Sequence, residues 1–172
     1  TTWNSSTSGT TNPLKGVTFG NNTFVAVGDS GTILTSPDGT TWTSRTSGTS
    51  DHLYQVTYGN GNFVAVGDSE QILTSPDGTT WTTRSSGTSE IIEGITYANN
   101  NFVAVGQGGT ILTSSDGSTW TSRTSGTTAS LIGVTYGNNV FTAVGFSGTI
   151  LTSYDRTTWS SKTSGSTIAL IG

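Results

Sequence analysis

Tryptophan recurs at a single interval along this chain. The five Trp residues stand at positions 3, 42, 81, 120 and 159, so 39 residues separate each one from the next. A fixed period of about 20–50 residues is typical of repeat proteins in which each period forms one supersecondary unit. We therefore predict one domain, or a fragment of a larger domain, over residues 1–172. Its repeats are about 1–39, 40–78, 79–117 and 118–156, with a partial fifth over 157–172.

Each period contains four short stretches with strand-like patterning. In one repeat they are residues 16–20, 24–28, 32–36 and 41–45. The turns between them contain Asn21-Asn22 and Asp38-Gly39, and Asn and Gly tolerate the positive φ angles that tight hairpins need. The second and third stretches are apolar on both faces, which is typical of strands covered on both sides. Each repeat is thus expected to be a four-stranded antiparallel meander, packed between copies of itself.

These features predict an all-β protein, a β-propeller of four-stranded antiparallel blades with a 39-residue repeat. A β-trefoil has three repeats, and a solenoid needs parallel strands, which the short hairpin turns exclude. Four full repeats leave a 16-residue overlap, because residues 157–172 duplicate residues 1–16. Residues 1–7 and 157–163 would compete for the same edge of the last blade. We expect a homo-oligomer formed by terminal strand exchange, or a chain cut from a longer array.

The motif that carries Trp42, Ser-Pro-Asp-Gly-Thr-Thr-Trp over residues 36–42, resembles the Asp-box, or BNR repeat, of bacterial sialidases and related propellers. The longer segment 31–42 resembles the repeats of photosystem II assembly-factor-type propellers. This chain has one residue fewer between Asp and Trp than the usual box, so a shortened turn is expected. In the fourth copy Arg156 replaces the Gly, and that turn should be the most strained or differently shaped.

The Asp and Trp residues of these motifs are expected to be structural. The Asp carboxylate can accept N–H groups of its own turn, and the Trp can fill the seam between blades. The structural Asp-box residues are Asp38, Trp42, Asp77, Trp81, Asp116, Trp120, Asp155 and Trp159.

Catalysis is not expected. A sialidase site needs an arginine cluster, whereas Arg45, Arg84, Arg123 and Lys162 follow the repeat and should be spread around the rim. His52 is the only histidine, with no Ser or carboxylate partner evident in the sequence. The chain has no cysteine and no calcium-loop spacing, so we expect no metal and no cofactor. A net charge of −4 argues against nucleic acid, and no apolar run is long enough to span a membrane.

Variation between repeats is concentrated on one face of the predicted propeller. The second-to-third and fourth-to-first connections share this face, and six of the ten carboxylates fall on it. Such loops are common sites of binding, although loops without a function also drift in sequence. The candidate binding residues are Asp29, Asp51, His52, Tyr54, Asp68, Glu70, Glu90, Glu93 and Phe146.

The sequence therefore favours a non-catalytic binding or scaffolding module, with a protein or weak glycan ligand on the variable loops. The alternative is a structural, engineered or excised repeat fragment that assembles into larger propellers without a ligand. A glycoside hydrolase relative is the third alternative. The surface, rich in Thr, Ser, Gly and Asn, favours an extracellular or cell-surface location.

Overall fold

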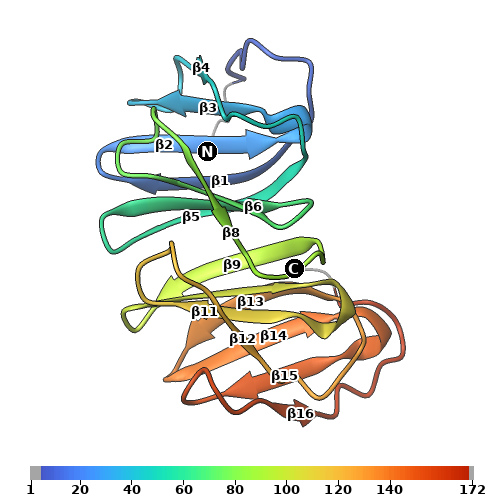
Figure 1. The fold of residues 1–172 in the computed structure, drawn as a ribbon. Helices are drawn as coiled ribbons and strands as arrows, with labels where there is room; N and C mark the ends of the chain where they lie inside the picture. Colours follow the sequence, from blue (N-terminus) through green and yellow to red (C-terminus); the bar gives the residue numbers. More distant parts are fainter. Residues whose placement is uncertain (1–4, 171–172) are drawn as a thin grey trace.

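The computed structural model describes residues 5–170, and this part of the chain folds into four separate four-stranded antiparallel sheets. In every sheet the strands lie side by side in the order in which they follow one another along the chain. The sheets stack one upon the next, from the first at the top of Figure 1 to the fourth at the bottom. The predicted all-β, propeller-like arrangement of four-stranded antiparallel blades is thus confirmed. Each sheet is called a blade from here on.

The first blade consists of β1 (Leu14–Gly20), β2 (Thr23–Gly28), β3 (Ile33–Ser36) and β4 (Thr43–Arg45). The second consists of β5 (Leu53–Gly59), β6 (Asn62–Gly67), β7 (Gln71–Ser75) and β8 (Thr82–Ser85). The third consists of β9 (Ile92–Ala98), β10 (Asn101–Gly106), β11 (Ile111–Ser114) and β12 (Thr121–Arg123). The fourth consists of β13 (Leu131–Gly137), β14 (Val140–Gly145), β15 (Ile150–Ser153) and β16 (Ser160–Lys162). Short 3-10 turns join the second and third strands of three blades: η1 (Asp29–Gly31), η2 (Gln107–Gly109) and η3 (Phe146–Gly148).

The core is divided among the three seams between blades. At the first seam Val25, Val27 and Ile33 of the first blade pack on Leu53 and Val56 of the second. The second seam uses Val64, Val66, Ile72, Ile92 and Ile95, and the third uses Val103, Val105, Ile111, Leu131 and Phe141. Each middle blade is therefore covered on both faces, which explains why its central strands are apolar throughout.

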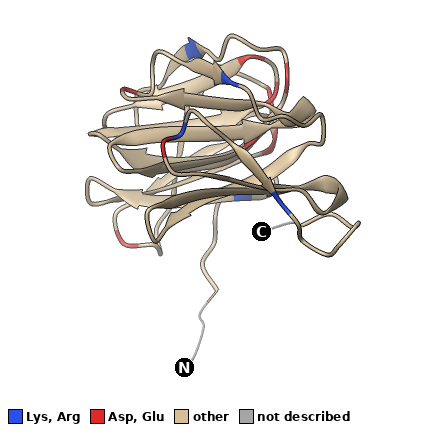
Figure 2. Ribbon diagram, turned by 90° about the horizontal axis from the view of Figure 1, so that it is seen from below, with Lys and Arg blue, Asp and Glu red and all other residues tan. Residues whose placement is uncertain are grey.

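The C-terminal copy of the duplicated 16 residues completes the last blade. β16 pairs with β15 of the same chain, so the fourth blade takes its edge strand from its own hairpin. A short hairpin loop closes at a small entropic cost, which favours this local pairing. Residues 160–162 therefore complete the last blade of their own chain in this structure. Trp3 lies outside the described residues, and residues 5–13 contain no strand. In Figure 2 the part of this segment nearest the N-terminus extends away from the blades, whereas Asn12 Nδ2 donates to Thr32 Oγ1 at 2.9 Å.

Candidate functional site

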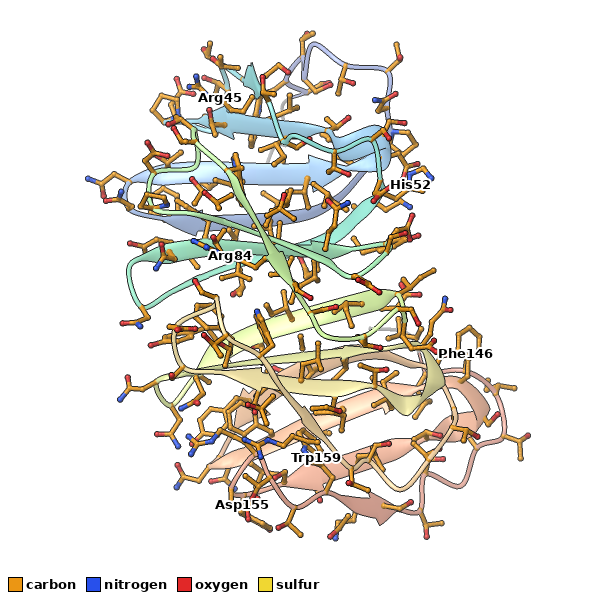
Figure 3. All side chains as sticks on the ribbon, in the orientation of Figure 1. Arg45, His52, Arg84, Phe146, Asp155 and Trp159 are labelled. Carbon is orange, nitrogen blue, oxygen red and sulfur yellow. The ribbon has the colours of Figure 1, made fainter. Side chains whose placement is uncertain are left out.

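The two ends of the blades differ in chemistry. The variable face carries the connections from second to third strands and from each blade to the next. The turn face carries the β1–β2 and β3–β4 turns and their equivalents. His52 and Phe146 lie along the variable face, at the right edge of Figure 3, whereas Asp155 lies on the turn face at the left. The few charged residues lie mainly in loops and at strand ends rather than within the sheets (Figure 2).

A β-bulge interrupts the first strand of every blade, close to the variable face. Leu14 pairs with Gly28 and Gly16 pairs with Val27, which leaves Lys15 as an extra residue on β1. The same shift leaves three further bulge residues, Tyr54, Glu93 and Ile132. Bulges re-aim side chains and are frequent beside functional sites. The fold thus places one re-aimed side chain per blade along the inner strands.

The bulge residue of the first blade lies in a cluster of opposite charges at the first seam. Lys15 Nζ is 2.6 Å from Asp29 Oδ1 and 4.3 Å from the centre of the Tyr54 ring. His52 Nδ1 lies 2.9 Å from the same Asp29 oxygen. Lys15 above all, and His52 in addition, hold the pKa of Asp29 below its usual value.

His52 therefore has a carboxylate partner, contrary to the prediction from the sequence. The partner was missed because Asp29 belongs to the neighbouring blade and approaches only through the seam. His52 Nδ1 also lies 3.3 Å from the backbone nitrogen of Ser30. A carboxylate only accepts and an N–H only donates, so Nδ1 serves Asp29 when it carries a proton and Ser30 when it does not.

Tyr54 and Asp68 extend the cluster on the second blade. Burial, together with the neighbouring carboxylate of Asp68, raises the pKa of Tyr54 to about 12. The backbone N–H of His52 donates to Asp68 Oδ2 at 3.4 Å. Asp68 Oδ1 is buried, and the Asp68 carboxylate forms a side-chain hydrogen bond with Tyr54.

Other candidate residues of the variable face stand apart from this cluster. Asp51 accepts a hydrogen bond from Gln71 Nε2 at 3.0 Å, and Glu93 accepts one from Gln107 Nε2 at 3.4 Å. Glu93 still lies near enough to contribute to the raised pKa of Tyr54. The structure thus brings together Asp29, His52, Tyr54 and Asp68, with Glu93 at the border. It leaves Asp51, Glu70, Glu90 and Phe146 elsewhere on the face.

Lys15, Gln71 and Gln107 are members of this surface that the candidates chosen from the sequence omitted. A signal was present for Lys15: it occupies the variable segment of the first repeat, whereas the other basic residues of the repeats lie on or near the outer strands. Its pairing with Asp29 depends on the bulge, which the sequence pattern did not reveal.

On the turn face the repeated Asp residues organise their own turns. Asp38 Oδ1 accepts the backbone N–H groups of Thr40 and Thr41 at 2.8 and 2.9 Å, and the hydroxyl of Ser36 at 3.0 Å. These backbone donors hold the pKa of Asp38 far below its usual value. Trp42 Nε1 donates to the carbonyl of Gly39 at 3.2 Å. The other three turns repeat this pattern around Asp77, Asp116 and Asp155.

The fourth turn keeps this geometry although it contains Arg156. Arg156 has φ +69°, close to the +76° of Gly39, and Asp155 Oδ1 still accepts the N–H groups of Thr157 and Thr158. The turn is therefore not differently shaped, because the Asp carboxylate imposes the same conformation. The expected strain is present as a non-glycine residue in the left-handed region.

The basic residues of the outer strands do not converge on one point. Arg45 Nε donates to Thr35 Oγ1 at 2.8 Å, Arg84 to Thr74 at 3.2 Å and Arg123 to Thr113 at 2.9 Å. Each arginine is thus held within its own blade. In residues 5–170 no group of three or more His, Asp or Glu side chains is placed to hold a metal ion, and no helix is long and apolar enough to cross a membrane.

Comparison with known proteins supports the fold. The chain resembles YCF48 from Cyanidioschyzon merolae (TM-score 0.68, 20% identity, covering 87% of this chain and 56% of that one). It also resembles a structure described as YCF48 bound to D1 peptide (TM-score 0.63, 18% identity, covering 87% and 52%). A third similar structure is the computationally designed Ika4 protein (TM-score 0.70, 16% identity, covering 84% and 92%).

The chain spans little more than half the length of the two YCF48 chains. No protein-family model and no curated protein sequence matches it. At these identities the similarity concerns the architecture alone: the blades of this chain are arranged as in known propeller proteins.

Proposed function

We propose that this chain is a non-catalytic binding module that takes a protein or peptide segment on its variable face. The observation that carries the proposal is the row of bulge residues Lys15, Tyr54 and Glu93, which crosses three adjacent blades. A row of basic, aromatic and acidic side chains offers an extended ligand several different contacts. One structural neighbour is described as binding a peptide, which is consistent with this proposal.

The ligand is expected to contact both the aromatic ring and the carboxylates. Tyr54 provides a partly buried ring with a hydroxyl group, and such rings are common anchors at interfaces. Asp68 and Glu93 would favour basic or hydrogen-bond-donating groups of the ligand. A sugar could use the same groups, so a weak glycan ligand is the competing proposal. The Asp-box identity of the turn-face motifs is also proposed, with the bonds around Asp38 and its counterparts as support.

A peptide-display screen on the immobilised chain tests the proposal, with a glycan array as the second arm. Tyr54→Ala should weaken binding of a selected peptide at least tenfold by calorimetry. The matched control is Tyr154→Ala, which removes an exposed tyrosine from the turn face and should leave the affinity unchanged. Equal losses in both variants, or ligands found only on the glycan array, would contradict peptide binding on the variable face.

We also propose that the chain self-associates. Strand exchange was the contact predicted from the sequence, and because β16 completes the last blade, the exchange would fall to residues 1–7. Deletion of residues 1–9 tests this contact by light scattering. A shift to single chains would support strand exchange, whereas an unchanged mass would assign self-association to another surface.

A further inference from the structure

The first blade has one sheet face that no other blade covers. This head face carries Leu14, Val17 and Phe19 on β1, and all three side chains are exposed. Val17 is 62% exposed, whereas its equivalents one and two periods later, Val56 and Ile95, are only 3% and 6% exposed. The head face is thus chemically the same surface that the second and third blades bury in the seams.

The fourth blade has the complementary open surface. This tail face carries Thr142, Val144 and Ile150, which are only partly buried. In the three preceding blades the equivalent residues pack in a seam. A cavity of about 320 Å³ is lined mainly by the first strands of the second, third and fourth blades and reaches the tail face at Thr142 and Val144.

The seams define how a head face meets a tail face. Tyr58 lies so close to Gly20 that a Cβ on this glycine would be 2.1 Å from the ring, and Tyr97 lies on Gly59 in the same way. At the open ends both halves of this contact are unmatched. Phe19, the residue equivalent to Tyr58, is 54% exposed, and a Cβ on Gly137 would meet nothing within 4 Å.

The turn face repeats a second contact across the seams. Asn21 Nδ2 donates to the carbonyl of Pro76 at 3.4 Å, and Asn60 Nδ2 donates to that of Ser115 at 3.1 Å. By the same 39-residue spacing the series continues with Asn99, whose carbonyl accepts a hydrogen bond from Arg156 Nη1 at 3.3 Å at the third seam. It ends with Asn138 on the fourth blade, and the carbonyl that precedes it is that of Pro37 on the first blade. A head-to-tail contact between two chains would place Asn138 of one chain beside the Pro37 carbonyl of the other.

We propose that a second copy of this chain covers both open faces, with the head of each copy on the tail of the other. A twofold axis makes the two contacts identical, and two four-bladed chains then close a ring of eight blades, within the known range for propellers. The surface proposed is thus a sheet face, distinct from the terminal strands considered for self-association. It leaves the variable face of both copies accessible.

A second copy fits better than an unrelated partner because the chain already contains this interface three times. Tail-face residues such as Val25 and Val27 meet head-face residues such as Leu53 and Val56 within one molecule. Exposed apolar sheet faces of this kind are prone to pairing.

Docking makes one copy of the duplicated 16 residues redundant at each junction. The described C-terminal residues reach the tail side of the fourth blade, where Leu170 N–H donates to the carbonyl of Gly145 at 2.9 Å. Because residues 157–165 duplicate 1–9, residues 1–9 of the incoming copy would be displaced. Deleting residues 1–9 should therefore leave the association intact, which separates this proposal from strand exchange.

The experiment is multi-angle light scattering on the full chain and on two variants. One variant adds charge to the open head face, and the other adds bulk to the open tail face. The full chain should have twice the single-chain mass of 17.7 kDa. Val17→Lys on the head face and Gly137→Leu on the tail face should each raise the dissociation constant at least a hundredfold. Thr83→Lys and Thr83→Leu, on the exposed outer strand β8, are the matched controls and should leave the mass doubled.

Circular dichroism spectra that match the full chain show that the variants fold. A full chain that remains monomeric at high concentration overturns the proposal. A doubled mass that survives both face variants also overturns it, because another surface then holds the copies together. Assemblies larger than two chains, lost in both variants, would contradict the closed ring of eight blades.

Discussion

The ring of Tyr58 lies directly on Gly20 of the neighbouring blade, so close that a Cβ on this glycine would be 2.1 Å from the ring. Tyr97 and Gly59 repeat the relationship at the second seam. At the third seam Ala98 takes the place of the glycine, and Tyr136 packs in the same cluster. A small residue at the end of each first strand is therefore what allows an aromatic ring of the next blade to enter the seam.

Gly20→Leu should destabilise the chain by about 1–3 kcal/mol, because the larger side chain overpacks a filled seam. Gly137→Leu is the matched control, since a Cβ on this glycine would meet no atom within 4 Å. Its unfolding midpoint in urea, measured on dilute protein, should match that of the unmodified chain. Equal destabilisation by both changes would contradict the difference between filled and open positions.

Trp81→Ala should cost about 3–5 kcal/mol of unfolding free energy, as for other large-to-small changes in a core. Trp81 packs in the first seam, whereas Trp42 occupies the same position on the open first blade. Trp42→Ala should therefore cost less than half as much in dilute solution. Chemical denaturation of both variants checks the difference. A Trp81 variant that kept its stability and lost only ligand binding would show that this tryptophan is a ligand platform.

Arg156→Gly should stabilise the fold by about 0.5–1 kcal/mol. Arg156 holds φ +69° where the three other turns have glycine, and a non-glycine residue in this region costs about 1–2 kcal/mol. The greater backbone freedom of glycine in the unfolded chain offsets part of this gain. Thermal unfolding measures the effect, with Arg123→Gly, in a strand of the same chain, as a control that should destabilise. A lower melting temperature for Arg156→Gly would contradict the assigned strain.

The Asp residues of the turn face should make stability sensitive to acid. Backbone N–H donors lower the folded-state pKa of Asp38, Asp116 and Asp155 below the unfolded value of about 4, and the Thr79 side chain, with backbone N–H donors in addition, does so for Asp77. Their contribution is therefore complete above that value and is lost as the pH falls through the lower folded-state pKa values. Asp116→Asn should reduce stability at pH 7, and the difference from the unmodified chain should shrink towards pH 2. The urea unfolding midpoints of both proteins at pH 7 and pH 2 measure this stability difference. A difference that did not change with pH would contradict a stabilising role of the ionised carboxylate.

Incubation with sialosides and aryl glycosides should yield no hydrolysis. Arg45, Arg84 and Arg123 each donate to a threonine of their own blade, so they form no joint site for a carboxylate. Chromatography of the reaction mixtures for hydrolysis products tests this prediction. A rate abolished by a single Asp or Glu substitution would contradict the absence of catalysis.

The repeating part of the structure could be read from the sequence because it depends on local patterns. Alternating apolar residues, Asn and Asp-Gly turns and the 39-residue spacing of Trp each follow from neighbouring residues. The Asp38 carboxylate, for example, bonds only within its own turn. The sequence does not show which blades lie at the open ends of the stack. Val17 and Val56 occupy the same place in the repeat and differ only in whether another blade covers them.

The candidate site was predictable only in part, for a related reason. Sequence variation identified the face that holds Asp29, His52, Tyr54 and Asp68. It did not reveal that Lys15 leaves the ladder as a bulge residue and meets Asp29 and Tyr54. Contacts across a seam join residues roughly one period apart, so they depend on how blades stack rather than on the pattern within a blade.

The central claim, that the two open faces are the halves of one more seam, is tested most directly by a disulfide trap. The chain contains no cysteine, so Phe19→Cys and Gly137→Cys can be made on separate chains, mixed and oxidised. At the equivalent positions in the first seam, a Cβ on Gly20 would lie 2.6 Å from Tyr58 Cβ, so a small shift reaches the roughly 3.5–4.5 Å of a disulfide.

Gly20→Cys with Tyr58→Cys in one chain is the positive control, and Phe19→Cys mixed with Thr83→Cys is the negative control. We expect a linked pair of chains, with the peptide containing residue 19 joined to that containing residue 137 in the mass spectrum. Unlinked chains from this mixture, while the disulfide within the positive control forms, would contradict the claim.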